Sequence, residues 1–199
     1  MVINKDFKRK RKEDSRLPPG QVETMKFPVL SFGPVPKVPK DKWELKVYGL
    51  VENPVKFTWN ELLKLPQVNV VKDIHCVTRW SKFDTKWKGV PIDEIMKIVR
   101  PKPNAKFIIA YSYDGYSTNL PVEDVMNGKA MIATEYDGKD ITSEHGGPAR
   151  LLVPHLYFWK SAKWVKAIEF TDKNKPGFWE ARGYHIYGDP EKEQRFAGD

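Results

Sequence analysis

Short strand-like runs separated by turn residues constrain the fold of this sequence more than any other feature. Over residues 43–51 apolar and polar residues alternate, so that Trp43 and Val47 fall on one face, as in a half-buried strand. Two Asp-Gly pairs, at 114–115 and 137–138, are typical of hairpin turns between such runs. We expect seven further strands, at 55–57, 68–74, 107–112, 116–120, 131–135, 150–153 and 165–170.

Helix signals are few and short. Thr58 and Glu61 have the spacing of a capping box and predict a helix that ends before Pro66. Helical spacing of apolar residues predicts a second helix over 92–99, and a third short helix is expected over 121–127. Because no strand–helix–strand repeat is present, we expect the α+β class, with mixed β-sheet layers and a few short helices.

The length fits one domain. The chain has 199 residues, of which 40% are hydrophobic, enough for one core with little room for a second. We place this domain at 17–199. Residues 1–16 hold seven Lys or Arg and three Asp or Glu, and we expect them to form a basic, flexible tail. Residues 17–42 are rich in proline but also carry apolar residues, which predicts an extended segment that wraps the domain.

The net charge of +8 favours acidic partners or phosphate-bearing ligands. Most of this charge is lysine, whereas surfaces that read nucleic-acid bases depend on arginine, so we expect no nucleic-acid partner. No apolar stretch follows the basic residues at the N-terminus, and we therefore expect a cytoplasmic protein. No apolar run approaches the roughly 18 residues of a membrane span.

A single cysteine, Cys76, limits the chemistry that the chain can perform. A disulfide scaffold, an iron–sulfur cluster and a cysteine-rich zinc site each need several cysteines. The sequence also lacks the glycine-rich loops that bind dinucleotides or nucleoside triphosphates, the metalloprotease motif and the haem-attachment motif. The common self-contained redox and phosphotransfer sites are therefore excluded.

The first candidate site is Cys76, at the end of an expected strand. His75 precedes it and Arg79 follows three residues later. Nearby cations favour the thiolate, which ligates metals and attacks substrates. A thiol hydrolase with Cys76 as nucleophile and His145 or His155 as base is one interpretation, and a buried structural cysteine is another.

Two further clusters lie at strand ends, where binding sites are commonly built. In the stretch 145–150 (HGGPAR), paired glycines allow close approach of a backbone to a ligand, and Arg150 can bind a phosphate. In the aromatic stretch 157–164, Ser161 and Lys163 can donate hydrogen bonds to a phosphate as well. Each cluster also has an interpretation without a ligand. The stretch 145–150 would then be a turn with a surface arginine, and the stretch 157–164 a loop that covers the core.

Seven motifs follow one another over most of the chain. They are FPVLSFGPVP at 27–36, the alternation over 43–51, IHCVTRWS at 74–81, GVPI at 89–92, HGGPARLLVP at 145–154, SAKWVKAIEF at 161–170 and GFWEARGYHIYGDP at 177–190. In this order they resemble the molybdopterin-binding domain of the sulfite oxidase family. Within it, the chain is similar to small prokaryotic sulfite-oxidase-like proteins and to the catalytic subunit of periplasmic methionine sulfoxide reductase.

The resemblance implies mixed β-sheet layers around a pterin pocket, with molybdenum held by molybdopterin. It also implies that Cys76 is the metal's protein ligand. One soft thiolate is enough, because the dithiolene of the cofactor brings two further sulfur atoms. The residue that follows the strand at 107–110 is implied as a cofactor contact, and we place it at Tyr111 or Ser112. The other implied cofactor-binding residues are Leu30, Ser31, His145, Arg150, Ser161, Ala162 and Lys163.

The implied function is an oxidoreductase that transfers an oxygen atom to or from a small substrate, such as an S-oxide, an N-oxide or a sulfite-like molecule. Arg79, Tyr111 and Tyr184 are the candidates for the substrate mouth. Sulfite oxidases surround the metal with several arginines, whereas the loop after Cys76 offers only Arg79, which argues against sulfite as the substrate.

The chain encodes no haem, flavin or cluster motif, so a separate electron-transfer partner is expected. Two alternatives remain: a molybdopterin-binding module or carrier without turnover, and a nucleic-acid-binding domain that uses the basic tail. The substrate and the direction of oxygen transfer stay open. The oligomeric state also stays open, and a monomer is among the alternatives.

Overall fold

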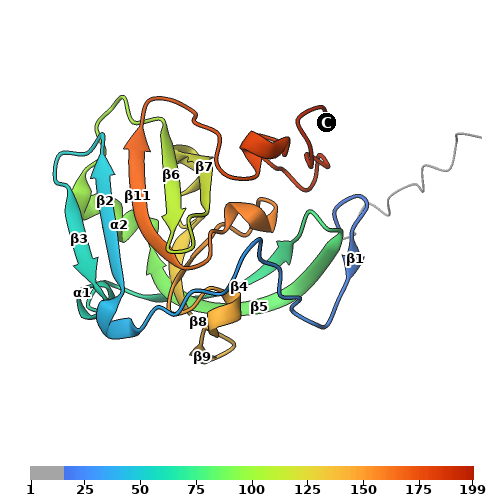
Figure 1. The fold of residues 1–199 in the computed structure, drawn as a ribbon, viewed down its shortest axis with the longest axis horizontal. Coiled ribbons are helices and arrows are strands. Elements are labelled where there is room, and N and C mark those ends of the chain that lie inside the picture. The colour runs from blue at the N-terminus through green and yellow to red at the C-terminus, as the bar shows by residue number, and fades with distance from the viewer. Residues whose placement is uncertain (1–15) are drawn as a thin grey trace, which may run out of the picture.

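Two β-sheets form the framework of this computed structural model, which describes residues 16–199 (Figure 1). The first sheet contains, in spatial order, β3 (Val55–Thr58), β2 (Glu44–Gly49), β11 (Val165–Thr171), β6 (Phe107–Ser112) and β7 (Ser117–Pro121). The second contains β1 (Val22–Glu23), β5 (Trp80–Pro91), β8 (Met131–Tyr136) and β10 (Arg150–Leu152), with β4 (Val68–His75) paired to β5 and β9 (Lys139–Asp140) paired to β8.

Helices are few and short. The two α-helices are α1 (Trp59–Leu63) and α2 (Ile92–Val99). Five 3₁₀ turns complete the elements of the described residues: η1 (Lys40–Lys42), η2 (Val122–Asp124), η3 (Ser143–His145), η4 (Phe158–Lys160) and η5 (Glu180–Arg182). The expected α+β class, with mixed sheets and few short helices, is confirmed. None of the helices in residues 16–199 is long and apolar enough to cross a membrane.

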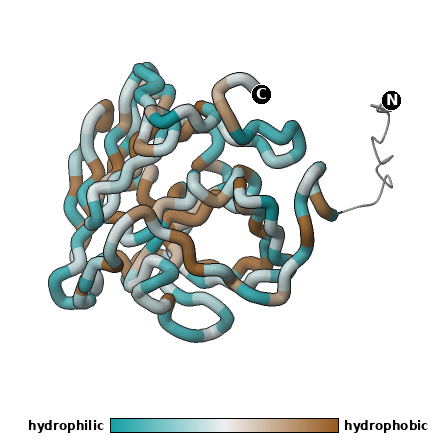
Figure 2. The backbone as a smooth tube through the Cα atoms, turned by 45° about the vertical axis from the view of Figure 1, so that its right-hand side comes forward, coloured by the Kyte–Doolittle hydropathy of each residue, from teal (hydrophilic) through white to brown (hydrophobic). Residues whose placement is uncertain are grey.

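Local sequence rules explain most of these elements. Along β2, Leu45 and Val47 are fully buried while Lys46 between them is exposed, as the alternation predicts. The capping box that begins α1 is present: the Glu61 amide donates to Thr58 Oγ1, and the Thr58 amide donates to the Glu61 carboxylate. Figure 2, coloured by hydropathy, shows hydrophobic and hydrophilic positions alternating along strands, as they do in β2.

The longest strand, β5, is not among the strands expected from the sequence, and one expected helix is shorter than expected. β5 carries Lys82, Asp84, Lys86 and Lys88 among its apolar residues, which hid the pattern, yet it lies at the centre of its sheet and pairs with β1, β4 and β8. The helix expected over 121–127 is only the 3₁₀ turn η2, and Asn127 and Gly128, which both adopt positive φ, bar its continuation beyond residue 126.

The main hydrophobic core lies among the two sheets and the helices. It contains Leu45 and Ile168 from the first sheet and Ile132 and Leu151 from the second. A smaller cluster around Trp87 and Phe158 belongs to the second sheet and its loops. The smaller cluster lies beside the candidate site described below, because Phe158 belongs to both.

Residue Arg16 is the first described residue, and it contacts the second sheet. Its guanidinium forms ion pairs with Asp73 at 2.6 Å and Asp84 at 2.8 Å. The rest of the expected basic tail lies outside the described residues. From Arg16 the chain runs through β1 and an irregular segment to η1 (Figure 1), so residues 17–42 follow the extended course that the sequence predicts.

A buried ion pair ties the C-terminal segment to the first sheet. Lys160 Nζ lies 2.6 Å from Glu180 Oε1, and both side chains are inaccessible to solvent. The ammonium also donates to the backbone carbonyl and side chain of Asn119 on β7 and to the carbonyl of Ile186. The Glu180 carboxylate accepts hydrogen bonds from Thr118 and Trp159 in addition.

Replacing Lys160 with Met is therefore expected to destabilise the fold strongly. The substitution leaves the Glu180 carboxylate buried without a cation, which costs about 3–5 kcal/mol in proteins. Lys175→Met is the matched control, since its pair with Glu169 is exposed at the lysine and worth about 1 kcal/mol or less. Urea denaturation measures both free energies of unfolding. Equal effects of the two substitutions would contradict a structural role for the buried pair.

Candidate active site

A cavity of about 320 Å³ lies where strand ends of both sheets meet. Cys76 follows β4, Ser112 ends β6 and Arg150 begins β10, and all three line it. Arg150, Lys163 and Asp114 are its charged residues. Nine of its twenty lining residues are aromatic: Phe27, Phe32, Trp80, Tyr116, Phe158, Trp159, Trp164, Trp179 and Tyr184.

Cys76 begins the tight turn between β4 and β5. Its amide donates to the Trp80 carbonyl at 2.8 Å, and its carbonyl accepts from the Arg79 amide at 3.0 Å. The Thr78 hydroxyl donates to Cys76 Sγ at 3.1 Å. Burial raises the pKa of the thiol above its ordinary value, so that a bound metal cation is what would favour the thiolate.

Arg150 is a buried cation without an acidic partner in the described part of the chain. Its guanidinium donates to the backbone carbonyls of His145 at 2.8 Å and Ser161 at 2.7 Å, and it lies 4.2 Å from the centre of the Phe158 ring. Burial lowers the pKa of Arg150 to about 9, which leaves it charged at neutral pH. A buried charge normally has an ionic partner, so this geometry favours an anionic ligand.

Lys163 is the second cation of the cavity. Within residues 16–199, its ammonium donates hydrogen bonds only to backbone carbonyls, as the Arg150 guanidinium does. Its ammonium donates to Leu30 at 2.6 Å and to Glu144 at 2.7 Å. Burial lowers the pKa of Lys163 to about 8, so most molecules keep the charge at neutral pH. The contact with Leu30 also holds the segment that forms one wall of the cavity.

Three buried donor atoms of cavity residues have no hydrogen-bond partner within residues 16–199. They are Trp80 Nε1, Ser112 Oγ and Arg150 Nε. Buried polar atoms of this kind are rare in proteins, and each one that remains needs an explanation, such as a ligand. Together with the two cations they give the cavity the donor set that a phosphate-bearing, heteroaromatic ligand requires.

The structure brings together eight of the twelve residues that the sequence analysis selected. Those that line the cavity are Leu30, Ser31, Cys76, Ser112, Arg150, Ser161, Lys163 and Tyr184. Four do not line it: Arg79, Tyr111, His145 and Ala162. Arg79 occupies a turn position with φ of 74° and its side chain is exposed. Ala162 is buried beneath the cavity wall, where its carbonyl accepts from the Leu151 amide.

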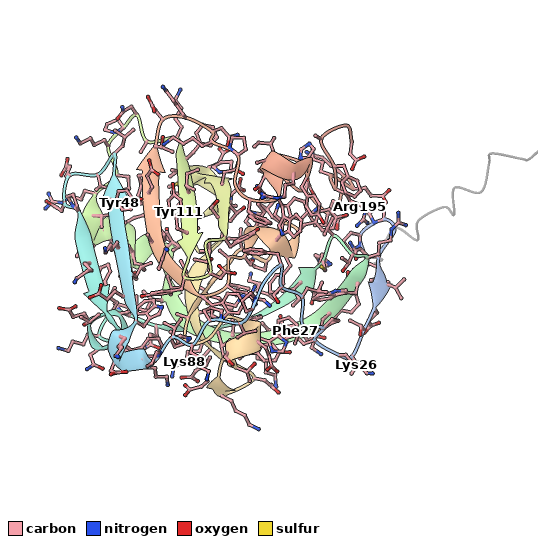
Figure 3. The ribbon with its side chains drawn as sticks, viewed as in Figure 1. Lys26, Phe27, Tyr48, Lys88, Tyr111 and Arg195 are labelled. Carbon is pink, nitrogen blue, oxygen red and sulfur yellow. The ribbon has the colours of Figure 1, made fainter. Side chains whose placement is uncertain are left out.

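Tyr111 and Ser112 illustrate how strand geometry sorts neighbouring residues. Successive side chains of β6 point to opposite faces, so only one of the two can face the cavity. Ser112 does so, whereas the Tyr111 hydroxyl donates to Glu169 at 2.7 Å on the outer face of the sheet. Figure 3 shows Tyr111 beside Tyr48 on the first sheet, away from Phe27.

His145 supports the cavity from behind its wall. Its ring lies 4.0 Å from the Phe27 ring, and Nε2 lies 3.1 Å from the Phe27 carbonyl oxygen. The neighbouring glycines have a related role. A Cβ atom on Gly146 would lie 2.8 Å from Lys163 Cβ, and one on Gly147 would lie 2.0 Å from the Ile141 carbonyl oxygen. The expectation that these glycines approach a ligand is therefore corrected: they let the protein pack closely on itself and bring Lys163 alongside.

The geometry gives no support to the thiol-hydrolase interpretation. His145 is held by Phe27 and Thr142, and His155 lies 3.0 Å from Asp124, so neither ring hydrogen-bonds to Cys76. The His75 ring contacts the Ser81 hydroxyl instead. A general base for a cysteine nucleophile must lie within hydrogen-bond reach of the thiol.

Sequence reasoning missed several cavity residues. Asp114 belongs to an expected hairpin turn, and nothing in its local pattern marked it as more than a turn residue. Trp179 lies inside the motif at 177–190, and nothing in that motif marks it as a cavity residue. Gln21 and Arg195 contact the Cys76 turn from outside those motifs, and no local pattern reveals that contact.

Comparisons with known proteins agree with this geometry. Residues 32–179 match the model of the oxidoreductase molybdopterin binding domain. The chain is 43% identical over 192 residues to the "Uncharacterized oxidoreductase YuiH" of Bacillus subtilis, covering 96% of this chain and 97% of that protein. It is 30% identical to the protein-methionine-sulfoxide reductase catalytic subunit MsrP of Burkholderia mallei, over 73% of this chain and 49% of MsrP. This chain therefore matches about half the length of that relative.

Among solved structures, the sulfane dehydrogenase SoxCD of Paracoccus pantotrophus is similar in fold. The TM-score is 0.64 at 26% sequence identity, and the match covers 70% of this chain and 40% of that chain. The family resemblance inferred from the sequence is thereby confirmed. The chain belongs to the oxidoreductase molybdopterin-binding domains of the sulfite oxidase family.

Proposed function

We propose that this chain is the catalytic part of a molybdenum oxidoreductase that transfers an oxygen atom to or from a small substrate. The observation that carries the proposal is the meeting, in a single aromatic cavity, of one cysteine and two cations that form no ion pair within residues 16–199. The cavity fits the molybdenum–molybdopterin group chemically. Arg150 and Lys163 complement its phosphate, the aromatic walls complement its ring system, and Cys76 supplies a soft ligand for the metal.

Each side chain has a task that follows from its surroundings. Arg150 and Lys163 would hold the phosphate, and the hydroxyls of Ser31, Ser112 and Ser161 can add neutral hydrogen bonds. The Asp114 carboxylate can accept hydrogen bonds from the N–H groups of a pterin ring. His145 would act indirectly by holding Phe27, and Ala162 through its backbone.

When bound, the cofactor supplies two-electron oxygen-transfer chemistry, and the protein supplies position and electrostatics. Cys76 would fix the metal at one end of the cavity. Trp80, Trp179 and Tyr184 line that cavity and would restrict the entry of water. Burial raises the pKa of Tyr184, and the charge of a Cys76 thiolate raises it further, so the phenol keeps its proton and can donate a hydrogen bond to a substrate oxygen.

Electrons are proposed to come from or go to a separate partner. No group of three or more His, Cys, Asp or Glu side chains in residues 16–199 could hold an additional metal ion. An S-oxide is the substrate class we favour, because a relative is named as a methionine-sulfoxide reductase catalytic subunit. The cytoplasmic location and the single-domain organisation stay predictions from the sequence.

The proposal is tested with protein made in a host that synthesises the cofactor. Reduced methyl viologen serves as an artificial electron donor and dimethyl sulfoxide, methyl p-tolyl sulfoxide and trimethylamine N-oxide as acceptors, while sulfite with ferricyanide tests the opposite direction. We expect oxidation of the viologen that depends on an S-oxide. Bound cofactor without turnover in either direction would instead support the alternative of a binding module or carrier.

A further inference from the structure

We propose that Gln21 and Arg195 are positioning residues for Cys76, each holding one peptide carbonyl of the Cys76 turn. The inference rests on the proposed function, in which Cys76 is the metal ligand. Gln21 and Arg195 come from opposite ends of the described chain, and both lie outside residues 32–179 that match the family model. They would act through the backbone of the turn and not by touching the cofactor.

Gln21 holds the turn from the N-terminal side. Its side-chain amide is buried and donates to the Cys76 carbonyl at 3.1 Å. The segment around it is fixed by backbone hydrogen bonds, because the Val22 amide donates to the Arg79 carbonyl at 2.9 Å and the Thr24 amide to the Ser81 carbonyl at 2.8 Å. These contacts make β1 a parallel neighbour of the first residues of β5 and place Gln21 against the turn.

Arg195 holds the turn from the C-terminal side. Its side chain is 5% exposed. One end of the guanidinium donates to the Val77 carbonyl at 2.8 Å, and the other donates to the Pro19 carbonyl at 3.3 Å. The guanidinium also lies 4.9 Å from the centre of the Tyr157 ring. Figure 3 shows Arg195 in the C-terminal segment, near the ends of β4 and β5 and the N-terminal segment.

Arg195 also contacts the residues that precede Gln21. Gly20 has φ of 68°, and a Cβ atom there would lie 3.2 Å from Arg195 Nη2, so the N-terminal segment packs directly against the guanidinium. The planar fork of arginine can bridge two carbonyls, whereas the single ammonium of lysine cannot reproduce that geometry. Arg195 therefore joins three stretches of chain: the Cys76 turn, residues 19–21 and the C-terminal segment.

Such support matters because the turn is short and strained. Arg79 adopts the left-handed region, which a non-glycine residue keeps only where its surroundings enforce it. The orientation of Cys76 Sγ depends on the backbone that Gln21 and Arg195 hold. Loss of a group that orients a metal ligand commonly costs about 10- to 100-fold in affinity or activity.

The test uses the variants Gln21→Met, Arg195→Met and Arg195→Lys, with Arg100→Met as the control. Arg100 is exposed, and in the described chain it forms an ion pair only with Glu52. Hydrogen exchange of peptides that cover residues 74–81 reports the turn with or without cofactor. The electron paramagnetic resonance spectrum of the half-reduced metal reports the geometry at Cys76, and kcat and KM are measured with the viologen assay.

We expect exchange in the turn to become about tenfold faster in Gln21→Met and Arg195→Met, because each variant loses one hydrogen bond to a carbonyl of the turn. Bound molybdenum should stay at the wild-type level, the resonance spectrum should change, and kcat should fall about 10- to 100-fold at nearly constant KM. Arg195→Lys should recover part of each effect, and Arg100→Met should match the wild type.

Unchanged exchange and an unchanged spectrum in both Met variants would overturn the inference. Faster exchange across the whole of Arg195→Met would point to general unfolding of that variant. Gln21→Met, which removes a neutral amide, then decides the question alone. If the wild type binds no molybdenum, the proposed function fails, whereas the exchange data still show whether the turn is clamped.

Discussion

Replacing Cys76 with serine is expected to reduce oxygen transfer to the background of the assay while the fold is preserved. Serine is nearly the same size, and its oxygen can also accept the hydrogen bond that the Thr78 hydroxyl donates to Cys76 Sγ. The substitution exchanges a soft thiolate for a hydroxyl that holds its proton more strongly and suits such a metal poorly. Arg150 and Lys163, which we propose as the ligands of the phosphate, remain in place.

Activity with methyl viologen and an S-oxide measures the loss, and thermal unfolding shows that the variant is folded. The phosphate site predicts that pterin still binds, so the loss should occur at the metal and not through an empty cavity. A fully active Cys76→Ser enzyme would remove Cys76 from the chemistry. Cys76 is the chain's single cysteine, so no other thiol can substitute for it.

Replacing Arg150 with methionine is expected to cause the second large effect, which is loss of the cofactor itself. The guanidinium lies buried at the cavity wall with Nε free of partners in the described residues. Charge-assisted hydrogen bonds are worth about 1.5–3 kcal/mol each, so removing the arginine should weaken cofactor retention about 10- to 100-fold or more. Arg150→Lys keeps the charge but loses the planar fork and should give an intermediate result.

Cofactor retention is measured as pterin fluorescence after gel filtration and acid oxidation, with Arg100→Met as the control for an exposed arginine. The two backbone carbonyls that Arg150 holds, of His145 and Ser161, lose a donor in the variant, so its free energy of unfolding is measured in parallel. A variant that keeps its pterin as tightly as the wild type would show that Arg150 serves the fold alone.

Several residues of the site follow from the sequence because their positions depend on local rules. Cys76 and Arg150 lie at the ends of strands that alternation or apolar runs predict, and strand ends gather at the cavity. The choice between Tyr111 and Ser112 was also decidable, since Ile108, Ala110 and Ser112 share one face of β6. Strand parity selects Ser112, whereas resemblance alone left both open.

Other features lay beyond local reasoning for physical reasons. β5 pairs on both sides although charged residues interrupt its apolar pattern, because its position depends on the strands around it. Arg195 reaches the Cys76 turn across 118 positions of sequence, and only the folded C-terminal segment brings the two together. Lys160 is a typical surface residue by type, yet its ammonium is buried against Glu180. Long-range packing determines these three cases.

The molybdenum content of the purified chain shows whether the cavity around Cys76 holds a molybdenum–pterin group. Elemental mass spectrometry of wild-type protein from a host that makes the cofactor should give about one molybdenum per chain, because one thiolate and one dithiolene complete one site. The same protein should release a fluorescent pterin on acid oxidation. A ratio near zero without pterin fluorescence would show that the cavity does not hold this group.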